Sequence, residues 1–427
     1  MADFTAAVYQ NEFLPDGGTD VNAIVTITCQ GAGTAGRSGA GDAGEIIIVD
    51  TSGSMGRTKL EAAKQAAAAA VDQIIDGTYF AVVAGTHQAY VAFPPVRQGA
   101  GMVRMDPSSR FAALQSIAMF RSDGGTAMGT WLTLAGRLFD SIPMLAQKHA
   151  ILLTDGENHN ETTEQLNSAI AMAVGKFQCD CRGVGVDWQV AEVRRIAQAL
   201  LGTVDIVPET PAEMSQEFAA MMQQAMSRGV ADAQLRVWAP QGSQVVFVRQ
   251  VAPTVEDLTP RRVDLNPLTG GYPTGSWGDE SRDYHISVRL PAKAVGQEQL
   301  AARVQLAVGS QVVAQGLVKA KWSDDEGLTT RINPQVAHYT DQTELAEAIQ
   351  EGLAAKAAGD DDLATQKLGR AVQLAKETGN AEATTRLRKV VDIDNEETGT
   401  VRLKRAVDKA DEMALDTAST KTTRIRG

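Results

Sequence analysis

Short apolar runs alternate with helix-like stretches over residues 44–228, and this alternation restricts the fold more than any other feature of the sequence. The first run, residues 45–49, is almost continuously apolar, which is typical of a strand buried on both faces of a parallel sheet. Further strand-like runs lie at 79–84, 89–93, 150–154, 184–186 and 204–207. Helical patterns lie at 58–75, 127–142, 161–175, 189–201 and 212–228. Alternating strands and helices with short turns predict a doubly wound α/β domain with a mostly parallel sheet.

The segments on either side of this domain have β-type patterns. Residues 1–30 alternate apolar and polar side chains, as a half-buried strand does. Residues 230–325 contain short strand-like runs separated by Gly- and Pro-containing turns. Together these segments predict a β-sandwich that takes one strand from the N-terminal segment and carries the α/β domain as an insertion. Residues 31–43 are rich in Gly, Ala and Ser and predict a flexible linker.

The C-terminal part of the chain returns to helical patterns over residues 337–415. Helices are expected at 344–358, 363–378, 384–391 and 400–414. Residues 416–427 are rich in Thr and lack apolar periodicity, so we expect a disordered tail. The sequence therefore predicts a multidomain chain with an α/β domain at 44–228, a β-sandwich and a C-terminal α-helical region.

The charge balance and the lengths of the apolar runs disfavour several classes of function. The chain has 40 Lys and Arg residues against 52 Asp and Glu residues, a formal net charge of −12. That excess of acid disfavours binding to nucleic acid or to an anionic membrane. No apolar run reaches the about 20 residues that a membrane span needs, and the first residues lack the basic and apolar parts of a secretory signal. Three cysteines fit no disulfide framework, which together with the missing signal leads us to expect a cytoplasmic protein. From the acidity we expect no nucleic-acid partner, and from the short apolar runs no membrane span.

Five oxygen-bearing side chains stand at turns of the expected α/β domain. Asp50, Ser52 and Ser54 follow the first strand, Thr126 precedes a helical pattern, and Asp155 follows another apolar run. Open α/β sheets bind their ligands beyond the carboxyl ends of the strands. Two carboxylates and three hydroxyls suit a hard divalent cation better than zinc or copper. Any one of these residues could be an ordinary helix cap, but the five together favour a metal site.

Three motifs follow one another in the sequence: Asp-x-Ser-x-Ser, Gly-Gly-Thr and Asp-Gly. Together they resemble the complete metal-ion-dependent adhesion site of von Willebrand factor type A domains. The chain as a whole resembles the bacterial cytoplasmic proteins that contain such a domain. The resemblance covers the predicted α/β domain and implies a Rossmann-like fold. It also implies that Ser52, Ser54 and Thr126 contact the metal directly. Asp50 and Asp155 would act partly through water or hydroxyl bridges.

The same resemblance implies a cofactor and a kind of partner. The metal is Mg²⁺, with Mn²⁺ or Ca²⁺ as the other possible ions. One coordination position stays open, and a Glu or Asp side chain of a protein partner fills it. We therefore expect a Mg²⁺-dependent protein–protein interaction module or scaffold.

An enzyme would need groups that the sequence does not supply. A haloacid-dehalogenase-like phosphatase needs a second acid two residues after the first, and that position is Ser52. The five histidines form no His-Glu-x-x-His or comparable metal pattern. We therefore predict a protein that is not an enzyme and has no catalytic residues, with a metal-dependent hydrolase as the least favoured class. The main alternative is a regulatory or substrate-recruiting subunit of an AAA+ or chelatase-like complex.

The C-terminal tail carries four threonines beside basic residues: Thr417, Thr420, Thr422 and Thr423. A solvated terminus is one interpretation, and a phosphoacceptor segment that recruits a partner is the other. Bacterial proteins that resemble this chain often occur in systems with Ser/Thr kinases, phosphatases and forkhead-associated domains. The resemblance therefore implies a kinase, phosphatase or forkhead-associated-domain partner in a signalling system.

Overall fold

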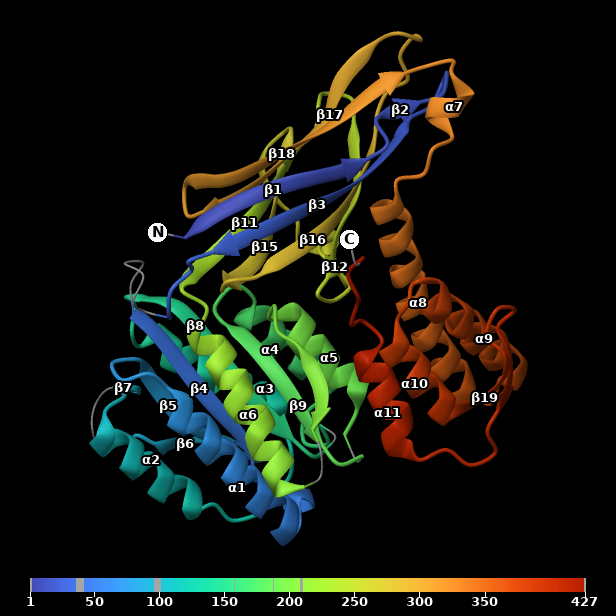
Figure 1. The fold of residues 1–427 in the computed structure, drawn as a ribbon. Coiled ribbons are helices and arrows are strands. Elements are labelled where there is room, and N and C mark those ends of the chain that lie inside the picture. The colour runs from blue at the N-terminus through green and yellow to red at the C-terminus, as the bar shows by residue number, and fades with distance from the viewer. Residues whose placement is uncertain are drawn as a thin grey trace. The chain divides into compact units, whose positions relative to one another are not determined.

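The chain folds into two units (Figure 1). The computed structural model describes residues 2–35, 42–95, 101–156, 158–186, 188–207 and 210–425. The first unit, called the α/β unit below, contains Ala32–Ala231 and Gly275–Gly278. The second, called the β/helical unit, contains Ala2–Gly31, Asp232–Thr274 and Asp279–Gly427. The β/helical unit is therefore discontinuous in sequence, because the α/β unit interrupts it.

The sheet of the α/β unit has the strand order β10-β9-β8-β4-β5-β6, and β7 also pairs with β5. Its strands are β4 (Asp42–Asp50), β5 (Tyr79–Gly85), β6 (Ala89–Phe93), β7 (Val103–Arg104), β8 (Leu145–Thr154), β9 (Gln178–Val184) and β10 (Val204–Val207). β4 pairs in parallel with β5 on one side and with β8 on the other. Because the next strand along the chain lies on one side of β4 and a later strand on the other, the strand order reverses between β4 and β8. Ligands of such sheets bind at this reversal, beyond the carboxyl ends of the strands.

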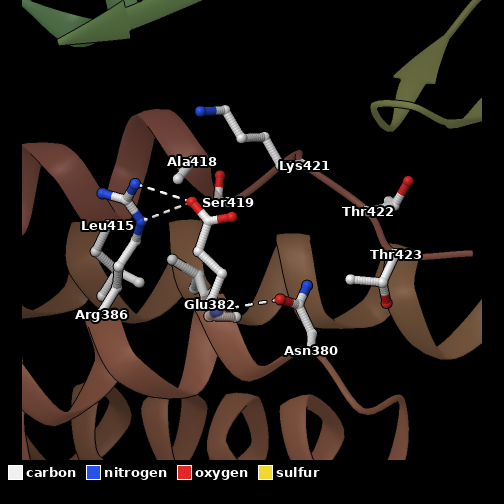
Figure 2. Close-up of a pocket in the computed structure, with 11 residues that line it drawn as sticks. Asn380, Glu382, Arg386, Leu415, Ala418, Ser419, Lys421, Thr422 and Thr423 are labelled. Carbon is white, nitrogen blue, oxygen red and sulfur yellow. Dashed lines mark hydrogen bonds and ion pairs between the residues drawn. The ribbon is translucent and has the colours of Figure 1, made fainter. Parts of the chain in front are cut away.

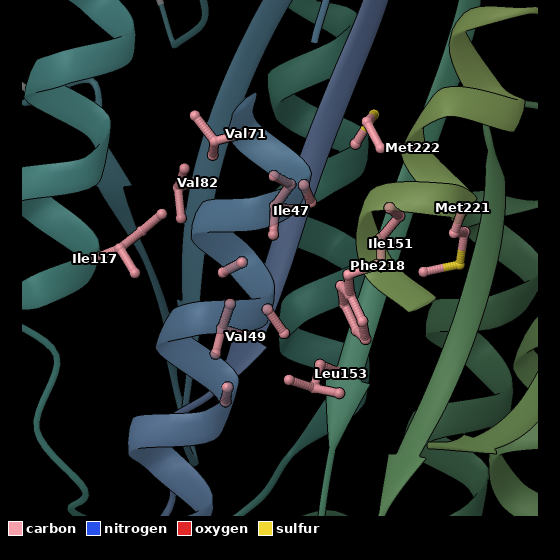
Figure 3. Close-up of a cluster of buried hydrophobic side chains, with 14 of the residues drawn as sticks. Ile47, Val49, Val71, Val82, Ile117, Ile151, Leu153, Phe218, Met221 and Met222 are labelled. Carbon is pink, nitrogen blue, oxygen red and sulfur yellow. The ribbon is translucent and has the colours of Figure 1, made fainter. Parts of the chain in front are cut away.

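Helices cover both faces of this sheet. They are α1 (Gly56–Gln73), α2 (Pro107–Ala118), α3 (Met128–Asp140), α4 (Thr163–Ala173), α5 (Val190–Ala199) and α6 (Pro211–Met226). Ile47 and Val49 of β4 lie in one buried cluster with side chains of α1, α2 and α6 (Figure 3). Ile46 and Ile48 alternate with them along the strand and are equally buried, on the side where α3 contacts β4. The predicted doubly wound, Rossmann-like fold is confirmed.

Helix α2 was not expected from the sequence. It begins at a capping box in which the Asp106 side chain accepts a hydrogen bond from the Ser109 amide, and Pro107 occupies its first turn. The helix leaves Phe111 65% exposed, so its apolar residues do not form a clean stripe along one face. The capping signal was present in the sequence, but the periodicity that would have supported it was not.

Two mostly antiparallel sheets form the β part of the β/helical unit. One has the order β1-β3-β16-β12-β13 and the other the order β14-β15-β11-β17-β18-β2. The strands are β1 (Asp3–Gln10), β2 (Phe13–Leu14), β3 (Asp20–Gln30), β11 (Val230–Trp238), β12 (Gln244–Ala252), β13 (Glu256–Asp257), β14 (Val263–Asn266), β15 (Thr269–Trp277), β16 (Ser281–Arg289), β17 (Glu298–Val308) and β18 (Gln311–Trp322). β3 of the N-terminal segment pairs with β16 along its length, and β1 contacts β18 of the other sheet. β2 pairs with β18 in parallel, so the N-terminal segment contributes strands to both sheets.

The C-terminal part of the β/helical unit is mostly helical. Its elements are α7 (Glu326–Thr329), α8 (Pro334–Ala357), α9 (Asp361–Glu377), α10 (Ala381–Val390), β19 (Val391–Asn395), β20 (Thr400–Leu403) and α11 (Lys409–Ala418). α8 and α9 approach closely at Gly352, where an added Cβ would lie 2.8 Å from Cγ of Leu368. Among the described residues, no helix has the length and apolar character that crossing a bilayer requires.

The predicted helix over residues 400–414 is wrong in its first half. Residues 400–403 instead form strand β20, which pairs antiparallel with β19. Val401 is buried in the helical core while its neighbours in the strand are more exposed, which is the alternation of a strand. Gly399 precedes the strand with φ of 65°, and its carbonyl oxygen would lie 2.3 Å from a Cβ added at Gly369. This close approach of two backbones depends on partners distant in sequence, which a local pattern does not reveal.

The predicted disordered tail is wrong for the described residues 416–425. Helix α11 continues to Ala418, so Thr417 is only 1% exposed. Beyond the helix, the Val255 amide donates to the Thr420 carbonyl at 2.7 Å. The Thr422 hydroxyl donates to the Val251 carbonyl at 2.7 Å. Residues 420–422 are held in place by hydrogen bonds to the end of β12 and the residues after it. Such contacts need no apolar periodicity, so the sequence pattern did not predict them.

The same C-terminal segment also contacts helix α8. The Gln342 side chain donates to the Thr423 carbonyl at 2.8 Å. Arg424 forms an ion pair with Asp283 of β16 at 3.1 Å, and the Tyr339 hydroxyl donates to the same carboxylate oxygen at 2.5 Å. Figure 2 shows this segment with α10 and α11 around a small hollow. The segment therefore joins the helical part to the β part of its unit.

The predicted flexible linker over residues 31–43 is only partly described. Residues 36–41 lie outside the described residues. Residues 42–43 belong to strand β4, and the Ala35 amide donates to the Met226 carbonyl at 2.8 Å. The described ends of this segment are therefore packed against the α/β unit, because their backbone groups find partners there.

Candidate functional site

The five predicted site residues lie together at the carboxyl ends of β4 and β8. Asp50 is the last residue of β4, and Asp155 follows the last residue of β8. Ser52 and Ser54 lie in the turn between β4 and α1, while Thr126 lies just before α3. The parallel pairing of β4 with β8 brings the first and last of these segments to the reversal in strand order.

Asp50 is held in one orientation by hydrogen bonds to both of its carboxylate oxygens. Oδ1 accepts from the Ser52 amide at 2.8 Å, and Oδ2 accepts from the Thr154 hydroxyl at 2.7 Å. The side chain has no exposure to solvent. Burial raises the pKa of Asp50, and the hydrogen bonds from Ser52 and Thr154 act in the opposite direction. The carboxylate is therefore fixed before any ligand arrives.

The side-chain oxygens of Ser52, Ser54 and Asp155 form a connected group. The Ser52 and Ser54 hydroxyls are 2.9 Å apart, and the Ser54 hydroxyl donates to Oδ1 of Asp155 at 2.8 Å. A Cβ added to Gly156 would lie 3.2 Å from the Ser54 hydroxyl oxygen and 3.4 Å from the Thr126 hydroxyl oxygen. The Ser54 and Thr126 hydroxyls therefore flank the same point, and the glycine leaves that point open.

The backbone around Thr126 is fixed by hydrogen bonds that the sequence pattern did not reveal. Asn160 accepts from the Thr126 amide at 3.0 Å through its side chain and donates its own amide to the Thr126 carbonyl at 2.9 Å. Any side chain at Gly125 would displace the Asn160 side chain, because an added Cβ would lie 1.7 Å from its Oδ1. The Gly53 amide donates to the Gly124 carbonyl at 2.8 Å, which joins this loop to the first one. Asn160 is therefore a positioning residue for the loop.

A lysine at the site was also missed by sequence reasoning. Lys59 of α1 places Nζ 2.8 Å from Oδ2 of Asp155. The Lys59 side chain is 31% exposed, while Asp155 is fully buried. A lysine one turn into a helix belongs to no metal-binding pattern. Only the position of α1 beside the end of β8 gives it a role.

The oxygen donors at this point fit a divalent cation that prefers oxygen ligands. Two carboxylates and three hydroxyls of five residues converge, and four of the five are at most 4% exposed: Asp50, Ser52, Thr126 and Asp155. No group of three or more His, Cys, Asp or Glu side chains suited to a metal occurs among the described residues. The donor set at the strand ends consists of oxygens, three of them hydroxyls, which suits Mg²⁺, Mn²⁺ or Ca²⁺ better than a soft metal.

A second group of buried charges lies farther back along the same strands. His149 of β8 lies 2.7 Å from Glu45 of β4 through Nδ1 and 2.9 Å from Asp180 of β9 through Nε2. Burial alone lowers the pKa of His149, but the carboxylates of Glu45 and Asp180 outweigh it and raise the pKa to about 9. Sequence reasoning missed this cluster because its members lie on three strands, and only the strand order brings them together.

Comparisons with known proteins match both units. The family model of the von Willebrand factor type A domain matches residues 46–157, and that of the von Willebrand factor type A C-terminal domain matches residues 373–419. A solved structure, a von Willebrand factor type A protein from Catenulispora acidiphila, is 48% identical. The match covers 99% of this chain and 97% of that one, with a TM-score of 0.92.

Two more distant matches add information on the fold and the length. The ArnB paralog VWA2 from Sulfolobus acidocaldarius is 14% identical with a TM-score of 0.59, and the match covers 98% of both chains. That likeness shows the fold alone. An uncharacterized protein of Synechocystis sp. is 28% identical over 219 residues, 50% of this chain and 49% of that protein. The chain therefore spans about half the length of that curated relative.

Proposed function

We propose that this chain, which belongs to the von Willebrand factor type A family, binds a protein partner through a divalent cation at a metal-ion-dependent adhesion site. The observation that carries the proposal is the chain of contacts from Ser52 through Ser54 to Asp155. These oxygens, with Thr126 beside them, meet where the strand order reverses. Such a point is where α/β sheets bind ligands.

Each residue has a separate task in this proposal. Ser52, Ser54 and Thr126 would hold Mg²⁺ directly, and Mn²⁺ or Ca²⁺ would fit the same donors. Asp50 and Asp155 would supply negative charge from behind the hydroxyls. When bound, the cation supplies an electrophilic position that accepts a carboxylate oxygen of a partner Glu or Asp.

The hydrogen bonds around the acids support a binding role. Thr154 and the Ser52 amide hold both oxygens of Asp50, so that carboxylate keeps its orientation without a ligand. Preorganised donors reduce the cost of ordering when a ligand binds. Ser52 occupies the position where a phosphatase of this topology would need an acid, and a hydroxyl is no general acid or base at neutral pH. We therefore propose an interaction module and not an enzyme.

Recruitment through phosphorylation of the C-terminal segment would need that segment to detach first. Thr417 is buried, and the Thr422 hydroxyl donates to the Val251 carbonyl. A kinase acting on Thr422 would have to separate the segment from β12, and one acting on Thr417 would have to expose a buried residue of α11. The adhesion site therefore has better support as the point of partner capture than the threonines do.

The experiment that tests the proposed function is partner capture with the full chain, from a lysate of the cells that produce it. The same protein should be captured in Mg²⁺, lost in EDTA and lost with Asp50→Asn. Asp140→Asn is the matched control, because Asp140 is an exposed acid of α3 that pairs with Lys176. Replacing the partner's contacting Glu or Asp by the amide should also abolish capture. Undiminished capture in EDTA would overturn the proposal, and a captured ATPase would favour a regulatory subunit of an AAA+ or chelatase-like complex.

A further inference from the structure

The geometry points to Lys59 as a built-in counter-ion of the metal site, an inference that rests on the proposed function. The ammonium of Lys59 pairs with Asp155 when no divalent cation is bound, and the cation displaces it when it binds. Lys59 therefore stabilises the cation-free protein and weakens the affinity for the cation. The site would then fill only above a cation concentration that this lysine helps to set.

The contacts of Asp155 carry the first step of this inference. Its Oδ1 accepts the Ser54 hydroxyl at 2.8 Å, and its Oδ2 lies 2.8 Å from Nζ of Lys59. Asp155 is fully buried, and a buried carboxylate without a positive partner is costly. Lys59 offsets part of that cost from the neighbouring helix.

The partial exposure of the Lys59 side chain carries the second step. Its side chain is 31% exposed, so its ammonium can reach water by rotating its stem. The stem passes Gly185, where an added Cβ would lie 3.5 Å from Cε and 3.7 Å from Nζ of Lys59. A lysine holds its partner as a compact point charge on a flexible stem, unlike the fixed fork of an arginine. The ion pair is therefore suited to break and form again.

The charges set the size of the effect. For the estimate, take a separation of about 6 Å between a bound divalent cation and an ammonium that stayed beside Asp155. At that distance, even with the dielectric constant of bulk water, the repulsion between a charge of +2 and one of +1 lowers the association constant about tenfold. A less polar surrounding makes the effect larger, and moving the ammonium away gives up its contact with Asp155. Whether the ammonium stays beside Asp155 or moves away, Lys59 lowers the affinity of the site for the cation.

The test compares the full chain with Lys59→Met, which keeps the apolar stem and removes the charge. Mn²⁺ binding is measured by titration calorimetry, and thermal unfolding is measured in EDTA and in excess MnCl₂. The variant should have a lower Tm than the wild type in EDTA, should bind Mn²⁺ about tenfold more tightly or better, and should gain more Tm from Mn²⁺. Lys64→Met is the control, because Lys64 lies on the same helix and pairs with Glu61. It should leave the Mn²⁺ affinity unchanged.

The outcomes separate this inference from the proposed function. If the wild type binds Mn²⁺ and Lys59→Met binds it equally or more weakly, the role of Lys59 is wrong while the metal site stands. If neither protein binds Mn²⁺, the proposed function itself fails. Lys59→Gln, which keeps a hydrogen-bond donor near Asp155, serves if the methionine variant does not fold. Its Mn²⁺ affinity should also exceed that of the wild type, and an affinity at or below the wild-type value overturns the inference.

Discussion

Raising the pH from 6.5 to 9 should remove about 3 kcal/mol of folding free energy, because His149 is protonated in the folded protein. The histidine is 6% exposed and lies within 2.9 Å of a carboxylate oxygen on each side, from Glu45 and Asp180. These contacts raise its pKa from the usual 6.5 to about 9 against the opposing effect of burial. Each unit of difference in pKa corresponds to about 1.4 kcal/mol, which gives the expected size.

The sign follows from the direction of the shift. Below pH 6.5 the histidine is protonated in both the folded and the unfolded protein, so its stabilising contribution is fully present. Between pH 6.5 and about 9 the unfolded chain releases the proton while the folded chain keeps it. The contribution therefore falls as the pH rises and is lost above the folded-state pKa.

The assay is urea unfolding of the wild type and of His149→Gln at several pH values in this range. Gln cannot titrate, so groups outside the cluster of His149, Glu45 and Asp180 cancel in the difference in unfolding free energy between the two proteins. We expect that difference to shrink by about 3 kcal/mol between pH 6.5 and 9. A difference that stays constant over this range would refute the reasoning, because the histidine would then not carry its charge in the folded protein.

Two substitutions test other contacts. Gly156→Ala places a methyl group 3.2 Å from the Ser54 hydroxyl oxygen, which must shift by a few tenths of an ångström, and 3.4 Å from the Thr126 hydroxyl oxygen. Mn²⁺ affinity should fall about tenfold with little change in Tm. An unchanged affinity by calorimetry would contradict this geometry. Tyr339→Phe removes the hydroxyl donor that lies 2.5 Å from the buried carboxylate of Asp283. The free energy of unfolding, measured in urea, should fall by about 1–3 kcal/mol. A change near zero would show that this hydrogen bond does not join the helical and β parts.

The predicted parts of the fold are those whose signal is local. The run at residues 45–49 predicts a buried strand because almost every residue in it is apolar. In the structure, helices cover both faces of β4, so side chains pointing to either face are buried. The oxygen-bearing residues of the candidate site could be found from the sequence because they stand just after a predicted strand or just before a predicted helix. Asp50 and Asp155 end neighbouring strands, so a motif in the sequence corresponds to a place in the sheet.

The parts that were not predicted depend on contacts between distant residues. Thr422 is ordered by the carbonyl of Val251, and nothing near residue 422 in the sequence indicates that partner. Lys59 reaches Asp155 only because α1 starts beside the end of β8. The strand at 400–403 pairs with β19, and Gly399 in the turn between them approaches the backbone of Gly369 in α9. These contacts override the local helical pattern. In each case tertiary contact, and not local propensity, determines the structure.

The most direct test of the central claim is a calorimetric titration of the full chain with Mn²⁺, run in parallel on Thr126→Ala. This substitution removes one hydroxyl from the site without changing any charge, and the backbone of Thr126 keeps its hydrogen bonds to Asn160. Ser116→Ala is the matched control, since the Ser116 hydroxyl donates to the Ala112 carbonyl within its own helix, α2, in a hydrogen bond that is exposed to solvent. We predict one bound ion per chain for the wild type and the control, and at least about tenfold weaker binding for Thr126→Ala. Equal binding by Thr126→Ala, or no binding by the wild type, would contradict the account.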